Sequence, residues 1–126
     1  MQKFLLLITT SPHYPNAQKA LDFARQQLAD GNSVQVFFYG DGAYTANRLL
    51  WQSADVPNVA DGWVALSAEH DLELPVCVST ALARGITDTQ NAQAHQLDGD
   101  NLRKPFCLVG LSQLALAMQN RQVVQF

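Results

Sequence analysis

Cysteine, charged residues and long apolar runs are all scarce in this sequence, and each scarcity excludes a class of protein. Two cysteines in 126 residues are too few for a small secreted domain held by several disulfides. Charged residues make up 15% of the chain and hydrophobic residues 48%, which excludes a disordered polypeptide. No apolar run approaches the roughly 18 residues that span a membrane. The composition therefore predicts one folded domain over residues 1–126.

Positive charge is also scarce. Eight Lys and Arg residues against eleven Asp and Glu residues give a net charge of -3, which argues against a large basic face for nucleic acid. The apolar run Phe4–Ile8 is shorter than the roughly 7–15 residues of a secretory signal core, and no small-residue cleavage pattern follows it. We therefore expect a cytoplasmic protein that contacts neither membranes nor nucleic acid directly.

Apolar segments alternate with helical patterns along the chain, without repeats or a linker. The segments predicted as strands are 4–9, 33–39, 74–78 and 122–126. The predicted helices are 16–30, 43–50, 61–70, 80–84, 87–97 and 112–120, with Asn16, Asp61 and Ser112 as candidate caps. This alternation is typical of βαβ units. It predicts a three-layer α/β domain, with a mainly parallel sheet of about five strands and helices on both faces.

Cys77 occupies a position where such a fold collects reactive groups. It lies at the end of an apolar strand, directly before polar residues that can start a helix. A thiol beside a helix N-terminus is near unpaired N–H groups and the positive end of the helix dipole, and both favour the nucleophilic thiolate. We predict that Cys77 is a nucleophile and that Ser79 and Thr80 donate hydrogen bonds to its anion. The alternative is that Cys77 is a buried strand residue.

The second cysteine and the histidines are weaker candidates. Cys107 has apolar neighbours on both sides and no basic or capping residue beside it, which favours a core role. The three histidines form no ligand spacing with either cysteine, so we expect no bound metal. His13 differs from the other two histidines, because its loop, 10–15, should open at the same edge of the sheet as Cys77.

Three other chemistries can be tested by spacing. Six residues separate Cys77 from Arg84, whereas a cysteine phosphatase loop has five, so that motif fails. Gly40-Asp41-Gly42 lacks the third glycine of a dinucleotide fingerprint and is better explained as a turn. Thr9-Thr10-Ser11 is a hydroxyl-rich loop that could hold a flavin phosphate, although it contains no glycine.

Several segments together resemble the DsrE-like sulfur-relay family, and the resemblance covers essentially the whole chain. The segments are Phe37-Phe38-Tyr39 followed by Gly40, Tyr44 and Asn47; Cys77 followed by Ala81-Leu82-Ala83-Arg84-Gly85; and the terminal Val123-Val124-Gln125-Phe126. The resemblance implies a sulfurtransferase subunit in which Cys77 carries a persulfide. It implies a TusA-like sulfur donor, a TusE-like acceptor, TusB- and TusC-like subunits in a heterohexamer, and no cofactor. The relay would end at the wobble uridine of tRNA.

The same resemblance implies that Pro12, Tyr14 and Tyr44, together with His13, form the rim of the site. The first loop departs from the family pattern Gly-Pro-x-Tyr-Gly, because it reads Ser11-Pro12-His13-Tyr14-Pro15. Three alternatives stay open at this point. They are a DsrE-type subunit of sulfur oxidation, an assembly subunit without catalytic activity, and a flavin, nucleotide or small-ligand binding module that uses loop 10–16.

Overall fold

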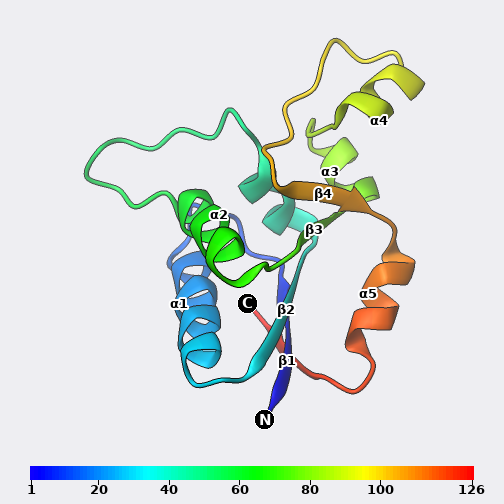
Figure 1. The fold of residues 1–126 in the computed structure, drawn as a ribbon. Coiled ribbons are helices and arrows are strands. Elements are labelled where there is room, and N and C mark those ends of the chain that lie inside the picture. Colours follow the sequence, from blue (N-terminus) through cyan, green and yellow to red (C-terminus); the bar gives the residue numbers. More distant parts are fainter.

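Five short strands form one parallel sheet in the computed structural model, which describes all residues 1–126 (Figure 1). Every pair of hydrogen-bonded neighbours runs parallel, and the strand order is β4-β3-β2-β1-β5. The strands are β1 (Lys3–Ile8), β2 (Ser33–Phe38), β3 (Leu74–Cys77), β4 (Phe106–Val109) and β5 (Gln122–Gln125). The prediction of a parallel sheet of about five strands is confirmed.

Helices cover both faces of this sheet, as predicted. The helices α1 (Pro15–Ala29) and α2 (Val59–His70) pack side by side on one face, and α5 (Leu111–Met118) lies on the other (Figure 1). The 3₁₀ helix η1 (Gly40–Ala46) follows β2 and the helix α3 (Val78–Ala83) follows β3, whereas α4 (Thr89–Ala94) lies further along the chain. None of these helices has the length and apolar character that a membrane crossing requires.

Two helices begin two residues before the first helical position that the capping pattern predicts. Asn16 is not the cap of α1, because Pro15 is the first helical residue. Proline is well suited to this position, since it lacks an N–H group that would be unpaired there. Ser112 is likewise inside α5, and Gly110 occupies the cap position. Both predicted caps are wrong, although both helices exist.

The start of α2 also differs from the prediction. Asp61 was a plausible cap by residue type, but α2 begins at Val59 and the side chain of Asn58 accepts a hydrogen bond from the N–H group of Ala60 at 3.0 Å. Asp61 lies in the first turn instead, where its carboxylate pairs with Arg103 at 2.7 Å. A carboxylate in the first turn also stabilises the helix through its dipole, which explains why the two residues are difficult to distinguish by pattern.

Two segments differ from the prediction in kind. The helix expected over 43–50 is a 3₁₀ helix that already begins at Gly40, so Gly40–Gly42 is its first turn rather than a separate turn. The sequence pattern also misses β4, a four-residue strand on the edge of the sheet. An apolar run of that length carries no periodicity that distinguishes a strand from a buried helical turn.

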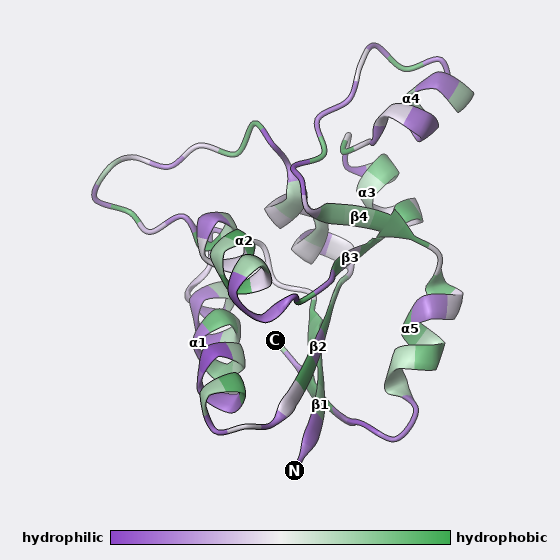
Figure 2. Cartoon of the chain, viewed as in Figure 1, coloured by the Kyte–Doolittle hydropathy of each residue, from purple (hydrophilic) through white to green (hydrophobic).

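The two faces of the sheet carry cores of very different size. On the face of α1 and α2, 21 buried residues form one cluster, in which the ring of Trp63 packs edge-on against Phe38 with centroids 5.6 Å apart. On the α5 face, the fully buried cluster consists of Leu5, Phe37 and Cys77 only. In Figure 2, β4 is hydrophobic along its length, whereas α5 combines hydrophobic and hydrophilic residues. One short amphipathic helix therefore covers the face that carries Cys77.

Candidate active site

Cys77 lies at the junction between a strand and a helix, as the sequence predicts. It is the last residue of β3 and the cap position of α3, with φ −60° and ψ 120°. It pairs with Val109 of β4, and its strand is also hydrogen-bonded to β2. The extended backbone therefore changes to helix directly after the thiol-bearing residue, at the carboxyl edge of the sheet.

The thiol of Cys77 is buried. Only 1% of the residue is exposed, and it clusters with Leu5 and Phe37 on the α5 face of the sheet. Side chains alternate between the faces along a strand, so Cys77 and Pro75 lie on one face while Leu74 and Val76 join the large core on the other. The strand register thus sets the face on which the thiol lies.

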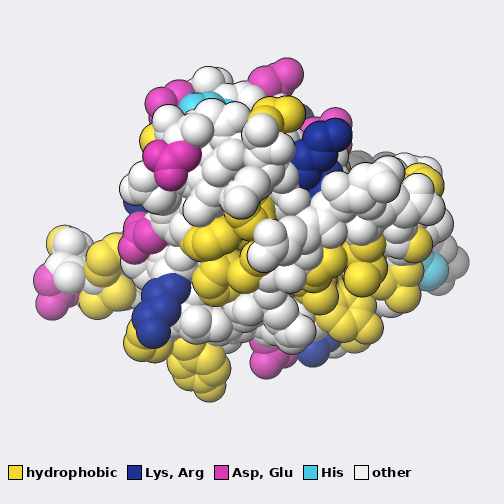
Figure 3. All heavy atoms as spheres, turned by 90° about the horizontal axis from the view of Figure 1, so that it is seen from below, with side chains coloured by type: hydrophobic (Ala, Val, Ile, Leu, Met, Phe, Trp, Pro, Cys, Tyr) yellow, Lys and Arg dark blue, Asp and Glu magenta, His cyan; other side chains and the backbone are white.

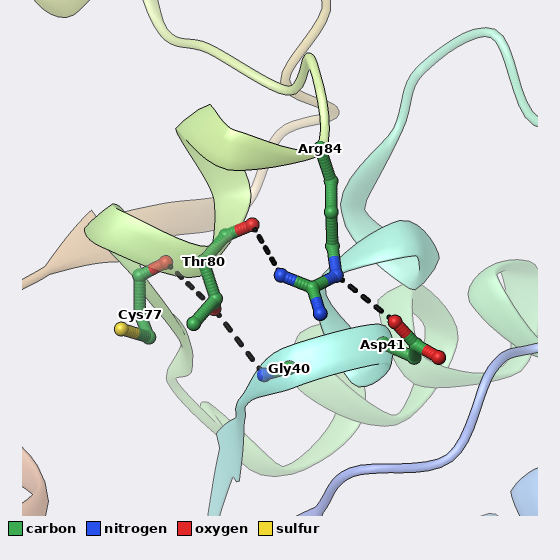
Figure 4. Close-up of polar contacts among 5 residues, drawn as sticks. All are labelled: Gly40, Asp41, Cys77, Thr80 and Arg84. Carbon is green, nitrogen blue, oxygen red and sulfur yellow. Dashed lines mark hydrogen bonds and ion pairs between the residues drawn. The ribbon is translucent and has the colours of Figure 1, made fainter.

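Thr80 holds the backbone around Cys77 rather than its sulfur atom (Figure 4). The hydroxyl group of Thr80 donates to the carbonyl oxygen of Cys77 at 3.3 Å and accepts a hydrogen bond from the N–H group of Gly40, also at 3.3 Å. Gly40 has a φ of 59°, a left-handed conformation that glycine adopts without steric cost. One hydroxyl therefore links the turn after β2 to the turn after β3. Ser79, the other predicted donor, is exposed and forms no side-chain hydrogen bond.

An ion pair that the sequence analysis missed strengthens this link. The Nε of Arg84 donates to Asp41 Oδ1 at 3.0 Å, and its Nη1 donates to the carbonyl oxygen of Thr80 at 3.1 Å. The guanidinium also lies over the ring of Tyr44, 5.9 Å from its centroid. Figure 4 shows Arg84 bridging Asp41 of η1 and Thr80 of α3. Asp41 and Arg84 are far apart in the sequence, so no local pattern could have paired them.

Three of the predicted rim residues lie in a different place. Pro12, His13 and Tyr14 line a cavity of about 230 Å³ together with Gln52, and no residue of β3 or α3 lines it. His13 Nδ1 is 3.1 Å from the side-chain nitrogen of Gln52. Because β2 lies between β1 and β3, the loop after β1 is separated from Cys77 by roughly 10 Å, two strand spacings.

The hydroxyl-rich loop after β1 uses its hydroxyl groups internally. Thr9 Oγ1 donates to the carbonyl oxygen of Phe126 at 3.0 Å, and Thr10 Oγ1 donates to that of Ser11 at 3.4 Å. Ser11 Oγ accepts from the N–H group of His13 at 3.3 Å. These bonds tie the loop to itself and to the end of the chain, and none of the three side chains lines either described cavity.

Cys107 is exposed, so its predicted core role is wrong. It lies on the edge strand β4, between Phe106 and Leu108, whose side chains pack on the large core of the opposite face. Its thiol reaches the carbonyl oxygen of Leu74 at 4.0 Å. Partial burial of the sulfur and the nearby carboxylate of Glu73 raise the pKa of Cys107 above its ordinary value.

The structure contains no candidate metal site, because no three or more His, Cys, Asp and Glu side chains are arranged to hold a metal ion.

The two cysteines lie on the same face of neighbouring strands. They are two residues apart in register, because Pro75 pairs with Cys107 and Cys77 pairs with Val109. Both thiols are free.

Comparison with known proteins agrees with the fold and the sequence motifs. The DsrE/DsrF-like family model matches residues 2–126. The chain is 41% identical over 124 residues to sulfurtransferase TusD of Serratia proteamaculans (strain 568), which covers 95% of this chain and 96% of that protein. It is 40% identical over 124 residues to sulfurtransferase TusD of Cronobacter sakazakii (strain ATCC BAA-894), with 95% and 97% covered.

Solved structures also resemble this fold at low sequence identity. The crystal structure of the ychN protein from E. coli matches this structure with a TM-score of 0.78, at 17% identity and over 100% of both chains. That likeness concerns the fold. Together with the match over residues 2–126, it confirms the resemblance found in the sequence: the chain belongs to the DsrE/DsrF-like family.

Proposed function

We propose that this chain is a sulfurtransferase subunit that carries sulfane sulfur on Cys77. The observation that carries the proposal is the position of Cys77, at the strand–helix junction of a chain about 40% identical to proteins named sulfurtransferase TusD. The other cysteine, Cys107, has a raised pKa, which lowers its thiolate fraction near neutral pH. Sulfur transfer between thiols requires no metal or organic cofactor.

The proposed reaction consists of two thiol exchanges. Cys77 is 1% exposed, so its thiol loses its proton to solvent only once it has become accessible, and the thiolate then attacks the terminal sulfur of a donor persulfide. The donor's S–S bond breaks, a new S–S bond forms on Cys77, and the donor leaves as a thiolate. An acceptor thiolate then attacks the terminal sulfur on Cys77 in the same way. Each step breaks one S–S bond and forms another, so no oxidant or reductant is consumed.

The residues around Cys77 have distinct roles in this proposal. The backbone N–H groups of Ser79 and Thr80 are the second and third of α3, and the first N–H groups of a helix lack intrahelical partners. We assign the stabilisation of the sulfur anion to these groups, whereas the Thr80 hydroxyl positions the backbone. Tyr44, beside Arg84, forms part of the rim, whereas His13 lies in the separate cavity beside Gln52 and has no assigned role in the transfer.

We place the chain in a relay whose sulfur reaches the wobble uridine of tRNA through proteins. A TusA-like donor and a TusE-like acceptor are the proposed exchange partners, and TusB- and TusC-like chains are the proposed neighbours in a heterohexamer. Exposed apolar side chains support subunit contacts, since Leu111, Leu116 and Met118 of α5 are 50%, 67% and 45% exposed. The net charge of -3 supports contact with carrier proteins rather than with RNA.

Mass spectrometry tests the assignment of the sulfur carrier. The purified chain is incubated with a persulfide donor, digested without reductant, and the two cysteine peptides are compared. We expect a mass increase of about 32 Da, one sulfur atom, on the peptide that contains Cys77 and none on the Cys107 peptide. Cys107→Ser is the matched control and should load like the wild type. Loading of Cys77→Ser, or loading of Cys107 instead, would contradict the proposal.

A further inference from the structure

The side chain on which the proposed function rests is closed to solvent. Cys77 is 1% exposed, whereas sulfur exchange requires that a second sulfur atom contact its Sγ directly. A donor persulfide on another protein therefore has no path to this thiol in the arrangement that the structure describes. Some part of the molecule that covers Cys77 has to move before the reaction.

The movable part of the cover over Cys77 comes from one helix. At the level of the sheet, the residues that pack against its cluster are Leu7 of β1, Tyr39 directly after β2, and Val109 of β4. Backbone hydrogen bonds hold all three in place, and the N–H group of Tyr39 donates to the carbonyl oxygen of Ile8 at 2.9 Å. Across the face of the sheet, the residues packed against the cluster are Leu114 and Ala117 of α5. These two are also the only residues of α5 that are partly buried, and the other six are exposed.

Apart from Leu114 and Ala117, α5 has few contacts with the sheet. None of its eight residues is fully buried, and its remaining side chains face solvent. A helix of this length is marginal in isolation, because the free energy of its first turn is unfavourable and few further residues follow. Gly110 precedes it, and Asn120, just after it, has a left-handed φ of 60°. Local opening of such a segment requires far less free energy than global unfolding.

A groove already runs along one side of this helix. Its volume is about 680 Å³, and it is lined by Leu116 and Ala117 of α5 and by Phe37 and Pro75 of the sheet. Two of these residues, Phe37 and Ala117, belong to the packing around Cys77. Figure 3, from below, shows hydrophobic side chains on this lower face of the molecule. The groove therefore leads to the cluster that contains the thiol.

We infer that Leu114 determines access to Cys77. Its side chain packs against the Leu5–Phe37–Cys77 cluster, and the thiol becomes available only when α5 moves away from the sheet. The significance of this access control rests on the proposed function, because it matters only if Cys77 carries sulfur. The packing of α5 over the Cys77 cluster is a property of the fold and does not depend on that function. Leu114 therefore has an access-controlling role, in which the residue acts on the reaction without contacting the reacting atoms.

Alkylation kinetics test this inference on the purified full chain. Iodoacetamide labelling is quenched at intervals, and peptide mass spectrometry gives the Cys77 rate relative to the Cys107 rate in the same sample. We expect Cys77 of the wild type to react much more slowly than Cys107. Leu114→Ala should raise the relative Cys77 rate by about tenfold, the effect of losing part of a packed side chain. Ser112→Ala, which changes an exposed side chain of the same helix that lines neither cavity, should change it by less than about twofold.

A wild-type measurement keeps the inference testable if Leu114→Ala does not fold. The dependence of the Cys77 rate on low urea concentrations reports how much surface the opening exposes. A local opening of α5 predicts a slope well below that of global unfolding. A slope equal to the global value would overturn the inference, as would a Cys77 rate as fast as that of Cys107, or equal rates in Leu114→Ala and Ser112→Ala.

The sulfur-transfer assay separates this inference from the proposed function. If Leu114→Ala exposes Cys77 but Cys77→Ser still transfers sulfur, the cover exists and the proposed carrier is wrong. If Cys77 is the carrier but Leu114→Ala leaves its alkylation rate unchanged, the carrier assignment holds and the cover is wrong.

Discussion

Thr80 contributes one hydroxyl group to two backbone hydrogen bonds, and those bonds join the two turns that flank the candidate nucleophile. The donor is Gly40 N–H, the acceptor is the carbonyl of Cys77, and Arg84 holds the carbonyl of Thr80 itself. Residue type and spacing correctly indicated that Thr80 is close to Cys77. They could not indicate which of its neighbours the hydroxyl would bind, because Gly40 is brought there only by the pairing of β2 with β3.

Replacing Thr80 tests this positioning role. Thr80→Val keeps the shape of the side chain but leaves the N–H group of Gly40 without its acceptor, so we expect a loss of about 1–2 kcal/mol in the free energy of unfolding. Thr80→Ser retains the hydroxyl and should lose less. Sulfur loading of Cys77 should slow in the valine variant and recover in the serine variant. Urea unfolding and loading rates measure both effects, and equal behaviour of the two variants would contradict the role.

The pKa of Cys107 gives a pH-dependent prediction. Burial of the sulfur is the larger cause of the raised pKa and the Glu73 carboxylate the smaller one. The alkylation rate of Cys107 should therefore rise with pH through a midpoint above the ordinary thiol value of about 8.5. Glu73→Gln should lower this midpoint only in part. An unchanged midpoint would show that the carboxylate does not act on the thiol.

The same raised pKa has a consequence for stability. The folded chain favours the neutral thiol of Cys107, so its contribution is fully present below the pKa of the unfolded chain. The contribution is lost as the pH rises through the folded pKa, in the alkaline range. Cys107→Ser should show a smaller alkaline loss of stability than the wild type in urea unfolding at a series of pH values.

Among the elements, α2 shows how a cap is identified only by its geometry. Asn58 accepts a hydrogen bond from the backbone at the start of α2, and Asp61 lies three residues later. Both residue types are good caps, so the sequence pattern alone selected the wrong one. We expect Asn58→Ala to lower the free energy of unfolding by about 1 kcal/mol. Asn58→Ser preserves an acceptor and should retain most of the stability; equal losses in thermal or urea unfolding would contradict the cap.

The 3₁₀ helix η1 depends on a close approach at Gly42. A Cβ at this position would overlap the carbonyl oxygen of Ile8 at the end of β1. Gly42→Ala should therefore lower the free energy of unfolding by on the order of 3 kcal/mol, since backbone cannot give way as a flexible side chain does. Gly110→Ala is the matched control, because only Ser112 Oγ comes near its Cβ, at 3.8 Å. We expect its change in unfolding free energy to stay within about 0.5 kcal/mol.

For the molecule as a whole, the alternation of strands and helices was enough to predict a parallel three-layer domain. Buried strands such as β1 are continuous apolar runs, and α1 has a clear helical period. The sequence could not predict the unequal cores of the two faces, because they depend on which helices cover each side. The arrangement of helices on the two faces determines the solvent exposure of both cysteines. Cys77 is buried under α5, and Cys107 is exposed on the edge strand.

The sequence predicted the candidate site about as completely as it predicted the fold. The position of Cys77 at the end of β3 follows from local pattern, since an apolar strand ends there and polar residues begin α3. The rim was less predictable, because His13 lies on a loop two strands away while Arg84 and Asp41 meet through the fold. Contacts between segments distant in the chain carry no local signal.

A sulfur chase tests the central claim most directly. The chain is loaded with radiolabelled sulfane sulfur and mixed with a TusE-like acceptor, and the label on Cys77 and on the acceptor is followed in time. The account predicts that the acceptor gains label at the rate at which Cys77 loses it, that Cys107→Ser behaves like the wild type, and that Cys77→Ser transfers nothing. Transfer at the wild-type rate by Cys77→Ser would contradict it.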